Sequence, residues 1–196
     1  MLTAKDIPYD FDQWSKPVDA GDGYAVRVQL SYDDTLREPW KEDDGHGPVS
    51  DWTQRDKRAG ELVLAGDHGQ RLYYDFAEAV RVAKRDGWDA PPYGRGSKGE
   101  RAARAVQRDF DYLRGWCRGE WHWTVVGVRV SRHGEEIETD YCGGIESKGD
   151  YWREHAAEVA NGIINHDQQS RLASWRGALR EARERRYWAQ RDVATV

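Results

Sequence analysis

The sequence contains few cysteines and no long apolar run. Only Cys117 and Cys142 are cysteines, which is too few for a disulfide framework and lacks the spacing of a metal site. We therefore expect two free thiols in a reducing cytoplasm. The first ten residues include Lys5, Asp6 and Pro8 and no apolar run, which predicts no signal peptide. No stretch approaches about 18 apolar residues, so we expect no membrane-spanning segment.

The motifs of several enzyme classes are also missing. The sequence has no G-x-S-x-G element around a nucleophilic serine, and no cysteine is paired locally with a histidine. It has neither of the glycine-rich motifs that bind nucleotides. Residues 94–99 (GRGSKG) superficially resemble a phosphate-binding loop, but they do not follow an apolar strand, and we interpret them as a flexible basic loop. The lack of a complete catalytic constellation favours a non-enzymatic protein without a cofactor.

What the sequence does contain is aromatic residues and unevenly distributed charge. Ten Trp, ten Tyr and three Phe supply apolar area for a core, which a chain of 196 residues can bury as one domain. The net charge of −5 does not favour strong non-specific binding to DNA. Residues 1–53 carry five Lys and Arg against twelve Asp and Glu, whereas residues 167–196 carry seven Arg against four acidic residues. This polarity predicts separate acidic and basic surfaces for partners, although two solvated faces would explain it too.

Alternating apolar residues predict strands. The clearest is 24–32, in which Tyr24, Val26, Val28, Leu30 and Tyr32 share one face. Turn residues at 66–69 and at 131–134 predict that the neighbouring strands form hairpins. The predicted strands are 24–32, 61–65, 70–74, 121–130 and 137–145.

Helical spacing of apolar residues predicts helices over 76–86 and 100–118, the first with an Asp75 cap and a stop at Gly87. Another helix follows Gly149 and is expected to break at Asn165 and His166. In a last helix over 168–190 we expect an inward-facing row and outward-facing arginines. The expected inward row is Leu172, Trp175, Leu179 and Ala182.

Together these elements predict an α+β fold with a mostly antiparallel sheet and helices packed on one face. Residues 23–190 form the predicted single domain. An irregular N-terminal arm over 1–22 precedes it, and a tail over 191–196 follows it.

Five segments of the chain resemble proteins of tailed bacteriophages and prophages. They are residues 44–52 (DGHGPVSDW), 55–61 (RDKRAGE), 74–88 (YDFAEAVRVAKRDGW), 110–116 (FDYLRGW) and 144–147 (GIES). The resemblance covers roughly residues 40–160. It implies a setting in the cytoplasm of a bacterial host and a dispensable accessory role outside the virion. It implies no catalytic residues.

The leading hypothesis is therefore a non-enzymatic phage accessory protein that binds a host or phage macromolecule. Inhibition of a host defence complex, such as a CRISPR effector, is one such role. The acidic and aromatic-rich region 33–56 is the expected contact, because acidic surfaces can occupy sites built for nucleic acid and aromatic residues anchor interfaces. The expected contact residues are Asp33, Asp34, Trp40, Glu42, Asp43, Asp44 and Trp52.

Two alternatives remain open from the residues alone. Asp43, Asp44 and His46 could hold a divalent metal for a hydrolase or nuclease, or they could simply structure their loop. Arg176, Arg180 and Arg183, on the last predicted helix, could follow the phosphates of a nucleic acid. A solvated helix face, or the arginine bias of a GC-rich genome, would explain these arginines as well.

Overall fold

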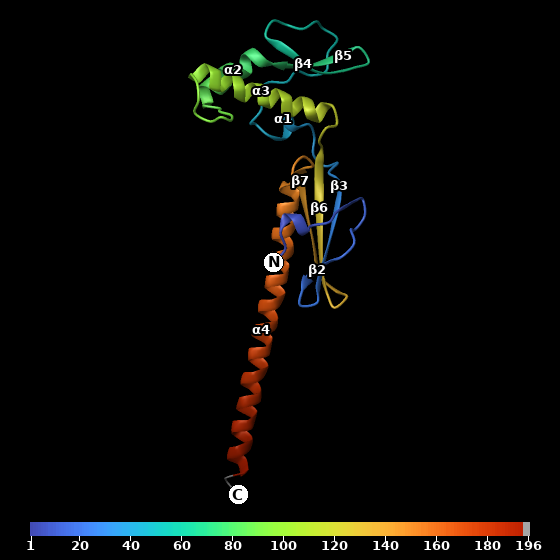
Figure 1. Ribbon diagram of the computed structural model, residues 1–196, viewed down its shortest axis with the longest axis vertical. Coiled ribbons are helices and arrows are strands. Elements are labelled where there is room, and N and C mark those ends of the chain that lie inside the picture. Colours follow the sequence, from blue (N-terminus) through green and yellow to red (C-terminus); the bar gives the residue numbers. More distant parts are fainter. Residues whose placement is uncertain (194–196) are drawn as a thin grey trace. The chain divides into compact units, whose positions relative to one another are not determined.

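The computed structural model of the protein describes the backbone of residues 1–193 and the side chains of residues 1–187 (Figure 1). The chain divides into two units. Unit 1 comprises Met1–Ser31, Thr124–Ile145 and the chain from Gly149 onward, and unit 2 comprises Tyr32–Trp123 and Glu146–Lys148. Of the predicted tail, residues 191–193 continue the last helix, and 194–196 lie outside the described residues. Within the described part of the chain, no helix combines the length and apolarity needed to cross a membrane.

Unit 1 contains a five-stranded mixed sheet. Its strand order is β1-β3-β6-β7, and β2 pairs with β3. Strand β1 runs parallel to β3 whereas β2 runs antiparallel to it. The α+β class is thus confirmed, and the sheet is mixed where a mostly antiparallel one was predicted. The elements are η1 (Ala4–Asp6), β1 (Asp10–Phe11), β2 (Val18–Gly21), β3 (Tyr24–Tyr32), β6 (Trp123–Arg132) and β7 (Glu135–Glu146).

The N-terminal arm, predicted to be irregular, adds β1 and β2 to this sheet. Its backbone bonds to β3 outside regular pairing as well, since the amide of Ser15 donates to the carbonyl of Val28 at 3.0 Å. At the other end of the sheet, β6 and β7 are joined by His133 and Gly134, whose φ angles of 49° and 88° suit a two-residue hairpin turn. This connection confirms the predicted hairpin.

The core of unit 1 lies between the sheet and the first half of helix α4 (Tyr151–Val193). The predicted alternation of β3 is confirmed from Tyr24 to Leu30, because Tyr24, Val26, Val28 and Leu30 are buried, whereas Tyr32 at the strand end is exposed. Trp152 and Ala156 of α4 belong to the same apolar cluster. Apolar packing between one sheet face and one helix therefore stabilises this unit.

Helix α4 is continuous through Asn165 and His166, so the predicted break is wrong. Each of these residues keeps its backbone N–H and costs only a few tenths of a kcal/mol in a helix, which neighbouring turns offset. Beyond Ile164, the last α4 residue in the core cluster, the helix carries an exposed apolar row. Leu172, Trp175 and Leu179 are 52%, 61% and 38% exposed, so their predicted inward orientation is also wrong.

Unit 2 combines a two-stranded sheet with three helices. Strands β4 and β5 pair antiparallel from Glu61 opposite Asp75 to Asp67 opposite Gln70, as the hairpin prediction required. An isolated bridge from Val49 to Tyr74 ties the segment 43–60, between α1 and β4, to β5. The elements are α1 (Pro39–Glu42), β4 (Glu61–Asp67), β5 (Gln70–Asp75), α2 (Phe76–Asp86) and α3 (Lys98–Cys117).

Helix caps in unit 2 follow the sequence signals. The side chain of Asp75 accepts a hydrogen bond from the amide of Glu78 at 2.9 Å, and Gly87 ends α2 with a φ of 78°. Ser97 and Glu100 form a capping box at the start of α3. This box draws residues 98 and 99 into the first turn of α3, so the loop predicted over 94–99 is shorter than expected.

Candidate functional site in unit 2

The loop that carries His46 is fixed to helix α3 through the carboxylate of Asp109. Nδ1 of His46 lies 2.6 Å from Oδ1 of Asp109. Oδ2 of Asp109 accepts hydrogen bonds from the backbone amide of Gly47 at 2.8 Å and from the hydroxyl of Tyr74 at 2.7 Å. The side chains of His46 and Asp109 are only 15% and 9% exposed. A single carboxylate thus holds the loop, the strand β5 and the helix α3 together.

The pair with Asp109 indicates which nitrogen of the His46 ring carries the proton. A carboxylate only accepts hydrogen bonds, so Nδ1 of His46 is the donor in the pair with Asp109. In the neutral ring, Nε2 then carries the lone pair. An imidazole oriented in this way can accept a hydrogen bond from a ligand.

Glycine is required next to His46. A Cβ atom at Gly47 would collide with the hydroxyl of Tyr74 and with the side chain of Ala79. The close approach of the loop to β5 and α2 therefore depends on the missing side chain. The approach also places the Gly47 amide within reach of Asp109.

Tyr112 of α3 stacks on the His46 ring. The two rings are stacked, with centroids 5.6 Å apart and an interplanar angle of 15°. The hydroxyl of Tyr112 donates to Oε1 of Glu146 at 2.9 Å. Burial, and next the bond to Glu146, raise the pKa of Tyr112 well above its usual value, so the phenol stays neutral.

His46, Asp109 and Tyr112 line a cavity of about 730 Å³. Acidic side chains outnumber basic ones in its lining, with five carboxylates and two cations. The carboxylates are Asp43, Asp109, Asp111, Glu120 and Glu146, and the cations are Arg108 and Lys148. Trp123 adds a second aromatic wall, and its indole N–H is fixed by the carbonyl of Arg37 at 3.0 Å. An excess of carboxylates beside aromatic rings suits a cationic ligand.

The predicted contact residues are only partly brought together. Asp43 lines the cavity, whereas Asp44 is exposed outside it. Asp33 is buried and accepts hydrogen bonds from Thr35, which makes it part of the fold.

The remaining predicted contact residues lie elsewhere in unit 2. Glu42 pairs with Arg37 at 3.0 Å. Trp40 is half-buried against Trp116, while Asp34 and Trp52 are exposed. The sequence-predicted region 33–56 therefore supplies one edge of the cavity rather than a single surface.

Most of the cavity comes from residues that sequence reasoning missed. Asp109 and Tyr112 lie on α3, more than sixty residues after His46, and Glu146 lies later still. One signal was present for Asp109. It falls within the apolar face defined by Val106, Phe110 and Leu113, and a carboxylate on such a face needs a buried partner.

The predicted metal ligands Asp43, Asp44 and His46 do not form a coordination group. Among the residues that the structure describes, no three or more His, Cys, Asp or Glu side chains are placed to hold a metal ion. Nδ1 of His46 is engaged by Asp109, and Asp43 accepts a hydrogen bond from the amide of Gly45 at 3.1 Å. The geometry thus offers the metal-dependent hydrolase alternative no support.

Comparisons with known proteins returned no relatives. No family model matched the chain, and neither did any curated protein or any solved structure. The resemblance to proteins of tailed phages stays an expectation from the sequence.

Proposed function

We propose that this chain is a non-enzymatic binding protein whose unit-2 cavity receives a basic side chain, lysine or arginine, from a macromolecular partner. The supporting observation is the excess of carboxylates around one cavity with two aromatic walls. Carboxylates attract a cation and can pair with its N–H groups, and the ring of Trp123 adds cation–π attraction. Nε2 of His46, another lining residue, supplies a hydrogen-bond acceptor.

The setting that we propose is a bacterial host cell, with a host or phage protein complex as the partner. Complexes that bind nucleic acid have basic surfaces, and a defence complex such as a CRISPR effector belongs to this class. An acidic cavity with oriented aromatic walls is complementary to such a surface. The resemblance of residues 40–160 to phage proteins agrees with this role.

The test is a pull-down from a host lysate, treated with nuclease and analysed by mass spectrometry. The double variant Asp43→Lys/Asp111→Lys reverses two exposed charges at the cavity edge and is expected to reduce recovery of the partner about tenfold. The matched control is Asp44→Lys/Asp51→Lys, which reverses two exposed charges of the same loop outside the cavity lining.

The control variant is expected to retain the partner. If both double variants lose it equally, general charge rather than the cavity is responsible, and the proposal is wrong. It is equally wrong if the cavity variant retains its partner. Circular dichroism of each variant confirms that the fold is intact.

A further inference from the structure

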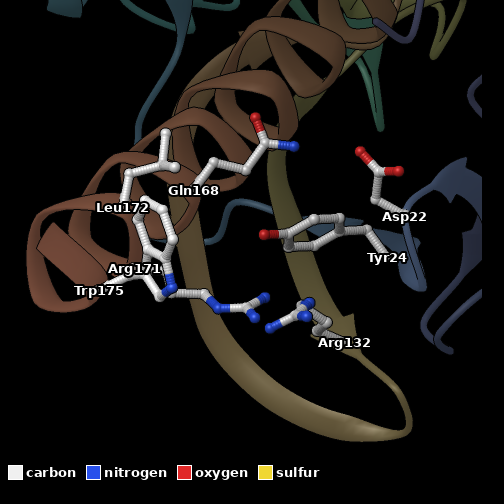
Figure 2. A pocket seen from close by; sticks show the side chains of 7 residues that line it. All are labelled: Asp22, Tyr24, Arg132, Gln168, Arg171, Leu172 and Trp175. Carbon is white, nitrogen blue, oxygen red and sulfur yellow. The ribbon is translucent and has the colours of Figure 1, made fainter. Parts of the chain in front are cut away.

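Unit 1 contains a second cavity, and its chemistry is opposite to that of the first. The cavity of about 510 Å³ lies where the second half of α4 passes the ends of β3 and β6. Figure 2 shows Trp175 and Leu172 on the helix side and the ring of Tyr24 on the strand side. The side chains of Arg171 and Arg132 point toward one another from the helix and from β6 (Figure 2).

Positive charge dominates this pocket. Its lining has two guanidinium groups and a single carboxylate, that of Asp22. The nearby carboxylate of Asp167 is engaged, because it accepts the hydrogen bond of the Tyr24 hydroxyl at 2.6 Å. Nε of Arg132 is buried and has no hydrogen-bond partner among the residues that the structure describes. This N–H donor belongs to a cationic group and lacks an acceptor among these residues. A bound anion would satisfy both its hydrogen bond and its charge.

The aromatic side chain of the pocket that is open for stacking is Trp175. Trp175 is 61% exposed, so a large part of the indole is open to a ligand. The ring of Tyr24 is held by its bond to Asp167, and the guanidinium of Arg132 lies 5.5 Å from its centroid. Burial, together with the Asp167 bond, raises the pKa of Tyr24 to about 12, so this phenol remains neutral. Gln168 adds an amide that can both donate and accept hydrogen bonds.

Positive charge continues along α4 beyond the pocket. Residues 168–187 contain six arginines and two glutamates. At 100° per residue, the row Leu172, Trp175 and Leu179 has arginines on both sides, and Glu181 and Glu184 fall on the far side. Arg176, Arg180 and Arg183, which the sequence indicated for nucleic acid, are all exposed. A polyanion that leaves the pocket would therefore meet further guanidinium groups along α4.

We propose that this pocket binds one nucleotide of a single-stranded nucleic acid, with its base stacked on Trp175 and its phosphate held by Arg132 and Arg171. The adjoining strand follows Arg176, Arg180 and Arg183. An isolated inorganic anion would leave the indole unused, and a carboxylate of an acidic protein helix would pair with the guanidinium groups but bring no flat ring to the indole. A nucleotide uses both features, since it joins a flat ring to a phosphate. This inference is independent of the function proposed for unit 2.

Fluorescence anisotropy with a labelled single-stranded oligonucleotide of twelve nucleotides tests the proposal on the full chain. We expect binding at 50 mM salt that weakens with rising salt by a slope of about −0.7 per phosphate contact in a double-logarithmic plot. Trp175→Ala is expected to weaken binding about tenfold at an unchanged salt slope, because it removes one base stack. Arg132→Gln and Arg171→Gln are expected to weaken binding and also reduce the slope.

Matched controls separate the pocket from general charge and from misfolding. Trp52→Ala and Arg81→Gln change an exposed tryptophan and an exposed arginine of unit 2 and are expected to leave binding unchanged. An abasic oligonucleotide is expected to bind the wild type more weakly, and to bind Trp175→Ala and the wild type equally.

Three outcomes would overturn the proposal. The first is no binding at 50 mM salt. The second is an equal affinity of the wild type for normal and abasic strands, which would mean that no base enters the pocket. The third is tighter binding of an acidic helical peptide than of the oligonucleotide, together with displacement of the strand, which would assign α4 to a protein partner.

Discussion

Units 1 and 2 use their charged side chains in opposite ways. In unit 2, carboxylates belong to the folded interior. Asp33 and Glu61 are buried, and the nearly buried Asp109 accepts hydrogen bonds from three donors. Among the described residues of unit 1, the buried polar side chains are the hydroxyls of Ser15 and Thr124, while Arg171, Arg176, Arg180 and Arg183 of α4 are exposed.

This difference decides which substitutions can report on function. In unit 2 the inner acid Asp109 cannot be replaced without loosening the loop of His46, so only outer acids such as Asp43 and Asp111 test ligand binding. In unit 1 the pocket residue Trp175 contributes little to the core, so its replacement reports on the ligand directly. Measurements of the free energy of unfolding can therefore test whether the two units differ in this way.

The largest effect is expected from two tryptophans of α4, Trp152 in its first turn and Trp175 in its second half. Trp152 is 5% exposed and contacts Tyr9 edge-on at 4.9 Å, whereas Trp175 is 61% exposed. Trp152→Ala should lower the free energy of unfolding by about 4 kcal/mol, because it removes a large buried side chain and leaves a cavity. Trp175→Ala should change it by less than about 0.5 kcal/mol. Urea unfolding of both variants measures the difference, and similar losses would show that the second half of α4 is also needed for the fold.

A somewhat smaller loss is expected from Asp109→Asn in unit 2. The amide group of asparagine turns its NH₂ toward one of the three donors now bound by the carboxylate, and one buried donor loses its acceptor. We expect a loss of about 3 kcal/mol and faster hydrogen exchange at Gly47 and along β5. Asp111→Asn, on the exposed side of the same helix, is the control and should be nearly neutral. Unchanged exchange near Gly47 in Asp109→Asn would mean that the carboxylate is not structural.

The sequence was a good guide wherever a local pattern determines the structure. The alternation from Tyr24 to Tyr32 needs only a period of two, and the Asp75 cap of α2 needs only its own helix. Each pattern is contained within a single element, and the structure confirms the cap and the alternation from Tyr24 to Leu30.

Features that depend on distant contacts were missed. The spacing of Leu172, Trp175 and Leu179 defines a helix face, but spacing cannot tell whether another element covers that face. The cavity of unit 2 joins His46 to Asp109 and Glu146, which the fold brings together from three parts of the chain. The continuity of α4 was missed for a different reason, because the weak helix propensities of Asn165 and His166 cost less than the adjacent turns contribute.

The smallest expected effect tests whether buried carboxylates make unit 2 sensitive to acid. Arg55 binds Glu61 through two hydrogen bonds of 2.7 and 2.6 Å, and the amide of Arg58 adds a third. The hydrogen bond from Arg55 lowers the pKa of Glu61 from 4.5 to about 2. Because the folded pKa is the lower one, this stabilisation is complete above about pH 4.5 and is lost as the pH falls through about 2.

Glu61→Gln should therefore destabilise unit 2 by roughly 2 kcal/mol at pH 6, and its difference from the wild type should shrink between pH 4.5 and pH 2. Hydrogen exchange of β4 at pH 6, 4 and 3 measures the difference, with β3 of unit 1 as the internal reference. If the stability difference between Glu61→Gln and the wild type stays constant over this range, Glu61 stabilises unit 2 through packing and not through its charge. Unit 2 would then resemble unit 1 in depending on packing, and the contrast between the two units would rest on Asp109 alone.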